Sequence, residues 1–240
     1  MIDSFLSSTD AHRATRTFEM LSLHDTSKWV LTGGFAVELH LFESRAESAS
    51  RPLNDIDFVV DRFEAIPATL SSDLIFRHVH PNDSANKTLV QSVFPQTAVR
   101  IDIFRCANSL FDRSVEVQIA GRTLRMISIE DLTARSARLS MDLDENQPMP
   151  AKHARDLLRL LPSVAKSKMQ TAWADHRKPR HPATFREAAE LLQRLIPART
   201  DLQVVPVYSR DYTSICARCE RTLSFPLADP ETIYALLGYC

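Results

Sequence analysis

The chain has 240 residues, of which 44% are hydrophobic and 25% are charged, and its formal net charge at pH 7 is −1. This composition excludes a disordered chain, and the near-zero net charge identifies no class of partner. No apolar run approaches the roughly 18 residues of a membrane span, and the first residues lack the pattern of a secretory signal, so we expect no membrane partner and a cytoplasmic location.

The first half of the chain has the pattern of a mixed α/β domain. Charged and apolar residues at 10–24 predict an amphipathic helix, and the apolar run after Gly34 predicts a buried helix from Phe35. Short β-branched and aromatic runs bounded by turn formers predict strands. These strands are expected at 28–31, 56–60, 74–79, 88–94, 98–104 and 115–119. Residues 1–126 therefore predict an α/β domain of the α+β kind.

The pattern changes to helices after residue 126. Ser128 followed by Asp131 is the signature of a capped helix start, and the helix is expected to run to about Leu139. Further helices are predicted at 151–161, 163–173 and 184–195, after an acidic linker at 141–150. We therefore expect a helical region at 127–200.

The last part of the chain, 201–240, is a C-terminal extension with a weaker pattern. We expect one extended piece at 203–208 and one short helix at 230–237.

Two of the four glycines of the chain stand together at Gly33 and Gly34, between a predicted strand and a predicted helix. Glycines at such a turn allow the backbone to approach a phosphate group closely, and the free amides at the helix start favour negative charge. A diglycine by itself is more often an ordinary turn. Its functional interpretation depends on the acidic residues that follow.

Asp55 and Asp57 are two residues apart on a predicted strand, so their side chains project from the same face. Two neighbouring carboxylates repel each other, and a divalent metal removes the conflict. Mg²⁺ prefers a few carboxylate oxygens together with phosphate and water. Asp102, on the strand at 98–104, supplies a third acid. We expect these three carboxylates to bind Mg²⁺ together.

In this order, Leu31-Thr32-Gly33-Gly34-Phe35-Ala36, Arg51, Asp55-Ile56-Asp57 and a later Asp102 resemble the DNA polymerase beta-like nucleotidyltransferases. Within that superfamily they look most like the AbiEii-type toxin nucleotidyltransferases. The run from Lys152 to Leu158 also resembles that group. The resemblance covers roughly residues 29–161 and implies a minimal nucleotidyltransferase mixed sheet flanked by helices, followed by a mainly helical C-terminal part.

The resemblance implies a role for each residue of the pattern. Asp55, Asp57 and Asp102 would be catalytic and would hold Mg²⁺, with Asp102 also helping to deprotonate an acceptor hydroxyl. Thr32, Gly33, Gly34 and Arg51 would bind an NTP such as ATP. In-line attack on the α-phosphorus would then release pyrophosphate.

The acceptor remains open between RNA, protein and a small molecule. Basic residues outnumber acidic ones between Lys152 and Arg186, which favours an RNA such as tRNA, although a solvated helical face explains the same pattern. A toxin would imply a cognate antitoxin protein. The alternatives are a catalytically inactive nucleotide-binding or regulatory module with the same fold, and an antibiotic nucleotidyltransferase.

The four cysteines are too few and too scattered for a disulfide framework, so we expect reduced thiols. Cys216 and Cys219 have the spacing of half a zinc site, which Cys240, His176 or His181 would have to complete. One such pair is weak evidence for a structural zinc ion.

Overall fold

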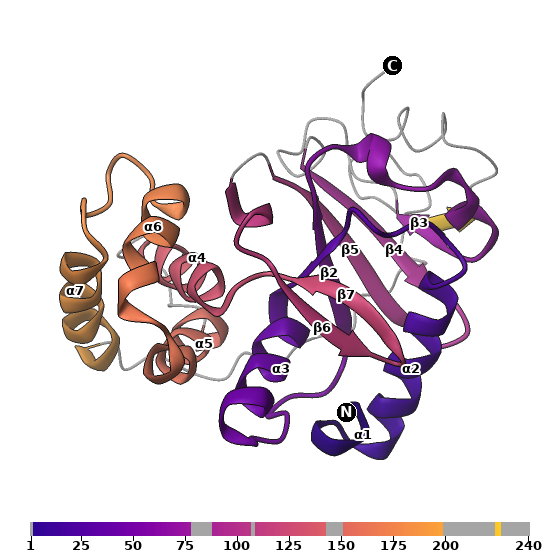
Figure 1. Cartoon of the computed structure of the whole chain (residues 1–240), viewed down its shortest axis with the longest axis horizontal. Coiled ribbons are helices and arrows are strands. Elements are labelled where there is room, and N and C mark those ends of the chain that lie inside the picture. The colour runs from indigo at the N-terminus through magenta and orange to yellow at the C-terminus, as the bar shows by residue number, and fades with distance from the viewer. Residues whose placement is uncertain (1, 78–87, 107–108, 143–150, 199–223, 227–240) are drawn as a thin grey trace.

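The computed structural model describes residues 2–77, 88–106, 109–142, 151–198 and 224–226. Figure 1 shows two parts, a β-sheet with helices packed against it and a cluster of helices beside that sheet. The predicted mixed α/β fold with a helical region after it is confirmed.

The sheet part contains three helices. These are α1 (Ile2–Phe5), α2 (Ser8–Leu21) and α3 (Gly33–Arg45). The helical cluster contains α4 (Ile129–Met141), α5 (Ala151–Leu160), α6 (Lys166–His176) and α7 (Phe185–Ala198). Short 3₁₀ turns lie at Phe63–Ala65, Ala68–Ser72, Ser109–Phe111 and Leu161–Ser163. Among the described helices, none is long and apolar enough to cross a membrane.

The sheet has eight strands in the order β6-β7-β1-β2-β5-β4-β3-β8. The strands are β1 (Val30–Thr32), β2 (Asp55–Val60), β3 (Ile75–Arg77), β4 (Leu89–Phe94), β5 (Val99–Arg105), β6 (Val115–Ile119), β7 (Arg122–Met126) and β8 (Ser224–Pro226). The β2–β5 and β1–β7 pairs are parallel, and the other neighbouring pairs are antiparallel. The central pair β2–β5 therefore joins two segments that are more than forty residues apart in the chain.

Two elements of the first half were not predicted. Strand β7 has the sequence Arg-Thr-Leu-Arg-Met, and its charged residues hide the alternation that identifies a strand. It pairs with β6 through a turn at Ala120 and Gly121, which both have positive φ angles of 49° and 76°. The four-residue helix α1 is too short to produce a periodic pattern.

The buried apolar residues form two clusters. The first lies mainly between the sheet and helices α1–α3, includes Phe35 and Ile56, and also contains Leu132 of α4 and Leu160 of α5. The second lies within the helical cluster around Trp173, which is fully buried. The helical cluster thus has an apolar core of its own and also contributes side chains to the core of the sheet part.

The start of α4 confirms the predicted cap, because the Ser128 hydroxyl accepts a hydrogen bond of 3.1 Å from the Asp131 amide. Of the linker expected at 141–150, Met141 ends α4 and Asp142 caps it, while 143–150 lie outside the described residues. The extended piece at 203–208, the helix at 230–237, Cys216, Cys219 and Cys240 also lie outside them. The two described histidines considered for zinc have other partners. His176 bonds to Asp131 and His181 bonds to Asp142.

Candidate functional site

The three predicted metal-binding aspartates come together at the centre of the sheet. Asp57 on β2 is directly opposite Asp102 on β5 in the parallel register, and Asp55 precedes Asp57 by two residues on the same face. One carboxylate oxygen from each residue lies within 4.8 Å of those of the other two. Asp57 and Asp102 are buried, with exposed fractions of 8% and 4%. The register of two strands therefore creates the cluster.

Glycine is required at position 33 because the backbone there lies very close to the carboxylate cluster. Thr32, the last residue of β1, pairs with Asp57 of β2, so the chain turns into α3 directly beside the carboxylate. Gly33 has a φ angle of +69°, and a Cβ atom placed on it would lie 1.7 Å from Oδ2 of Asp57. Only glycine fits this position, because a side chain would meet both a backbone strain and a collision. Glycine at position 33 therefore permits the turn and also leaves room for the Asp57 carboxylate.

Gly34 faces a different neighbour. A Cβ atom on it would lie 3.1 Å from the guanidinium carbon of Arg51, which belongs to a side chain rather than to the backbone. Arg51 itself is held by protein acids, with contacts of 3.3 Å to Glu38 and 3.2 Å to Asp156, and it donates to the Gly34 carbonyl. Arg51 thus lies next to the site, in ion pairs with two acids.

A shallow pocket lies along this side of the cluster. It is lined by Gly34, Arg51, Asn54, Asp55 and Lys152, together with apolar residues that follow α1, lie on α3 or precede β2. Carboxylate, cation and backbone groups therefore face one pocket, and they come from α3, from β2 and the segment before it, and from α5.

Burial and the repulsion of neighbouring acids make Asp57 and Asp102 hard to ionise. Burial is the main cause that raises the pKa of Asp57, to about 7, and the negative charges of Asp55 and Asp102 raise it further. Burial also raises the pKa of Asp102, while Arg100 lowers it. A cation placed among these oxygens would remove the repulsion.

Sequence analysis missed two side chains that contact the cluster. The Nε atom of Arg100 donates to both oxygens of Asp102 at 3.0 Å, and its Nη2 atom donates to Asp55. The side-chain amide of Gln91 on β4 donates to Asp102 at 3.2 Å. The signal for Arg100 was present, because it alternates with apolar residues on the same strand as Asp102. Gln91 was not detectable, since its pairing depends on the β4–β5 register.

A third missed residue is Arg135 on α4. It donates to the Thr32 hydroxyl at 3.3 Å, and its guanidinium carbon lies 5.4 Å from the centre of the Phe104 ring. Burial lowers its pKa, and the negative charge of Asp57 acts in the opposite direction. Arg135 connects the helical cluster to the end of β1.

His153 on α5 lies in the same positively charged surroundings. Burial lowers its pKa to about 4, and the charges of Lys152, Arg135 and Arg51 lower it further. His153 is therefore neutral at pH 7. The groups around the carboxylates are thus predominantly cationic, as a site for an anionic substrate requires.

The donor set fits a divalent cation with a preference for oxygen. It consists of carboxylate oxygens only, at mutual distances that one ion can span, and the raised pKa values of Asp57 and Asp102 indicate that these two lack sufficient positive charge nearby. Hard cations such as Mg²⁺ bind such ligands, whereas zinc and copper prefer nitrogen or sulfur.

No family model matches the chain, and no curated protein matches it. Among solved structures, it is similar to an antigenic nucleotidyltransferase-like protein from Paracoccidioides brasiliensis, with 17% identity, 82% of this chain and 94% of that chain covered, and a TM-score of 0.42. It is also similar to JHP933 from Helicobacter pylori, with 15% identity, coverages of 82% and 83%, and a TM-score of 0.43. A third is the Megavirus polyadenylate synthase, with 12% identity, coverages of 62% and 31%, and a TM-score of 0.42.

Proposed function

We propose that this chain is a Mg²⁺-dependent nucleotidyltransferase that moves a nucleoside monophosphate from an NTP to an acceptor hydroxyl. The observation that carries the proposal is the convergence of Asp55, Asp57 and Asp102 beside the Gly33–Gly34 turn. A carboxylate triad next to a helix start with free amides combines a cation site with a phosphate site.

In this proposal, Asp55, Asp57 and Asp102 hold the Mg²⁺ ions. When bound, Mg²⁺ neutralises charge on the triphosphate and stabilises the attacking and leaving oxygens. The backbone amides at Gly33 and Gly34 orient the phosphates, and the hydroxyl of Thr32 contributes a further donor. Asp102 accepts the proton of the acceptor hydroxyl, whose oxygen bonds to the α-phosphorus as the bond to the β-phosphate oxygen breaks. Pyrophosphate leaves.

The surrounding cations have a role in substrate binding. Lys152 lines the pocket beside Asp55, and Arg135 lies near Thr32. We assign both to the phosphate chain of the NTP, with Arg51 in support through its contact with Gly34. Positive groups of this kind stabilise charge that develops during phosphoryl transfer.

The test is transfer of label from each of the four α-³²P-labelled NTPs, with MgCl₂, to total RNA and total protein. We expect Asp55→Asn, Asp57→Asn and Asp102→Asn to reduce transfer by about a thousandfold or more, because each removes a charge that holds the metal. Asp61→Asn is the matched control, since Asp61 is exposed just beyond β2 and pairs with Arg62. Full transfer by the triad variants would refute the proposal.

For the acceptor we propose RNA of the tRNA kind, and for the biological role a toxin controlled by an antitoxin protein. The cationic residues of α4 and α5 next to the triad support the first, and the resemblance to AbiEii-type toxins supports the second. The labelling experiment identifies the acceptor directly. Co-expression with the neighbouring open reading frame, with growth as the readout, tests the antitoxin.

We also propose the division into an α/β domain at 1–126, a helical region at 127–200 and a C-terminal extension at 201–240. The two separate apolar clusters support the first boundary. Limited proteolysis followed by mass spectrometry would locate the boundaries.

A second candidate is a nucleotide-binding module without turnover. The ion pairs of Arg100 with Asp55 and Asp102 favour it, because they occupy oxygens that a metal would need. Calorimetry with NTP and Mg²⁺, combined with a pyrophosphate assay over the same acceptor pools, separates the two. Binding without pyrophosphate release would favour the module.

A further inference from the structure

Arg100 joins two of the three carboxylates of the triad. Its Nε atom lies 3.0 Å from both oxygens of Asp102, and Nη2 donates to Oδ2 of Asp55. The Arg100 side chain is 23% exposed, and the carboxylates that it contacts are 17% and 6% exposed. These are charge-assisted hydrogen bonds in a largely buried setting, the kind with the largest energies.

The backbone determines this arrangement. Arg100 lies opposite Asp55 in the β2–β5 register and two residues before Asp102, so all three side chains leave the same face of the sheet. The Arg100 amide also donates to the Asn54 carbonyl at 3.2 Å. The planar guanidinium is therefore held above the gap between the two strands, where its separate N–H groups reach one acid on each strand.

The charged surroundings of Asp57 differ from those of Asp55 and Asp102. It is not among the ion-pair partners of Arg100, and the cations that lower its pKa are the more distant Arg135 and Lys152. Arg100 thus neutralises Asp55 and Asp102, and among the described residues none forms an ion pair with Asp57.

We infer that Arg100 is a positioning residue that competes with the divalent cation for Asp55 and Asp102, so that cation binding requires its guanidinium to move away. This inference rests on the proposed function only in taking the triad as the cation site. Arg100 donates to both oxygens of Asp102 and to one oxygen of Asp55, and the cation would take its ligands from these same carboxylates. An N–H donor and a cation cannot share the same lone pair. Arg100 therefore sets the cation affinity of the triad.

Mn²⁺ binding to the full chain, followed by the electron paramagnetic resonance signal of free Mn²⁺, tests this. We expect Arg100→Gln to bind Mn²⁺ about tenfold more tightly than the unaltered protein, because the competing charge-assisted hydrogen bonds are gone. Arg100→Lys keeps the charge, but its single ammonium group cannot bridge two acids as the guanidinium does. We therefore expect Mn²⁺ affinity to increase by about threefold. Arg16→Gln on α2 removes an equal charge from an exposed Glu19 pair and should change nothing.

The outcomes are distinguishable. Affinity of Arg100→Gln equal to or weaker than that of the unaltered protein, while Asp57→Asn loses the site, would overturn the competition and leave the metal site intact. Identical Mn²⁺ binding by the unaltered protein and Asp57→Asn would overturn both the metal site and the role of Arg100. An unchanged Arg100→Lys would overturn the bridging of two acids as the cause.

A second measurement does not depend on tight binding. Without added cation, Arg100→Gln should unfold at a lower temperature, because the carboxylates lose their counter-ion. Addition of MnCl₂ should then raise the melting temperature of Arg100→Gln more than that of the unaltered protein. An equal increase would contradict the inference. Arg100→Lys gives the same comparison if the Gln variant does not fold.

Discussion

Asp57 in the sheet and Asp131 in the helical cluster are both buried aspartates, but their surroundings are opposite. Asp131 is fully buried and is bonded by Arg113 at 2.7 and 3.0 Å, by His176 at 2.9 Å and by the Ser128 hydroxyl. These bonds outweigh burial and hold its pKa far below the usual range. Asp57 lies beside two more acids, and its pKa is raised.

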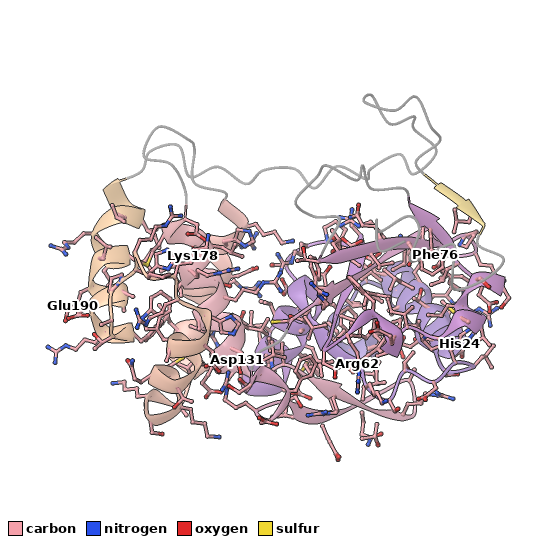
Figure 2. The ribbon with its side chains drawn as sticks, turned by 90° about the horizontal axis from the view of Figure 1, so that it is seen from above. His24, Arg62, Phe76, Asp131, Lys178 and Glu190 are labelled. Atoms are coloured by element: carbon pink, nitrogen blue, oxygen red, sulfur yellow. The ribbon has the colours of Figure 1, made fainter. Side chains whose placement is uncertain are left out.

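The difference shows that the buried charge of Asp131 supports the fold, whereas that of Asp57 does not. Figure 2 shows Asp131 at the boundary between the helical cluster and the sheet, where its bonds to Arg113 and His176 connect segments of both parts. Every strong contact of Asp131 is made within the protein. Within the part of the chain that the structure describes, Asp57 lacks such contacts, and a buried charge without them destabilises the fold unless a ligand supplies the missing charge.

The largest expected effect is on the free energy of unfolding, when Asp131 and Asp57 are each replaced by asparagine. Asp131→Asn should lower the free energy of unfolding by about 3 kcal/mol, since it leaves Arg113 without its main partner. Asp57→Asn should raise it at pH 8 without cation, by at least about 1 kcal/mol, because it removes a repelled charge. Urea unfolding of both variants measures the two changes.

Effects of the same sign at both positions would break the comparison. Asp61→Asn serves as the control for a surface aspartate and should change the free energy of unfolding by less than about 0.5 kcal/mol.

The next effect concerns the diglycine, where the chain offers a matched pair. Gly33 and Gly121 both have positive φ angles, of 69° and 76°, but a Cβ atom on Gly121 would meet nothing within 4 Å. Gly121→Ala therefore measures backbone strain alone, about 1 kcal/mol. Gly33→Ala adds the collision with Asp57, so we expect transfer to fall by about a hundredfold through displacement of the carboxylate.

Equal effects of the two alanines on stability, with transfer intact in Gly33→Ala, would contradict this account. The measurement is the transfer rate at saturating NTP together with urea unfolding of both variants.

These residues also show how far the sequence could be interpreted. The strand carrying Asp55 and Asp57, the strand carrying Asp102 and the glycine turn follow from local patterns, and the resemblance to a known superfamily implied that the three acids converge. The β2–β5 register that brings them together is not visible in a local pattern, and neither are the contacts of Gln91 and Arg135, because each depends on register or on packing between distant segments. A periodic pattern carries no information about such partners.

The helical cluster gives the same result for another reason. The Ser128 cap and the helices at 151–160 and 185–198 could be predicted within a few residues. The partners of Asp131 could not, because Arg113 precedes β6 and His176 ends α6.

A smaller effect is expected with pH. The pKa of Asp57 is about 7 in the fold against 3.8 for the free group. Its contribution to the free energy of unfolding is therefore fully present below pH 4 and is lost as the pH rises through 7. The cation binds the ionised form. Mn²⁺ affinity should therefore fall by about fivefold from pH 7 to pH 6 and change little above pH 8.

The binding reaction should also release a proton near pH 7, which calorimetry in two buffers of different ionisation enthalpy detects. His153 does not titrate in this range, since its pKa is lowered to about 4. If Mn²⁺ affinity does not change between pH 6 and pH 8, the ionisation of Asp57 does not control cation binding and the prediction is wrong.

The smallest effect is expected at Gly34, and it separates the two glycines. A Cβ atom there meets the end of the flexible Arg51 side chain, which can shift by a few tenths of an ångström. Alanine also favours the helix over glycine by about 0.5 to 1 kcal/mol, so Gly34→Ala should be neutral or slightly stabilising. If the backbone at this residue approaches the triphosphate as proposed, the KM for NTP should rise about threefold to tenfold with little change in kcat. An unchanged KM would mean that Gly33 alone accounts for the diglycine and that the second glycine has no contact with the nucleotide.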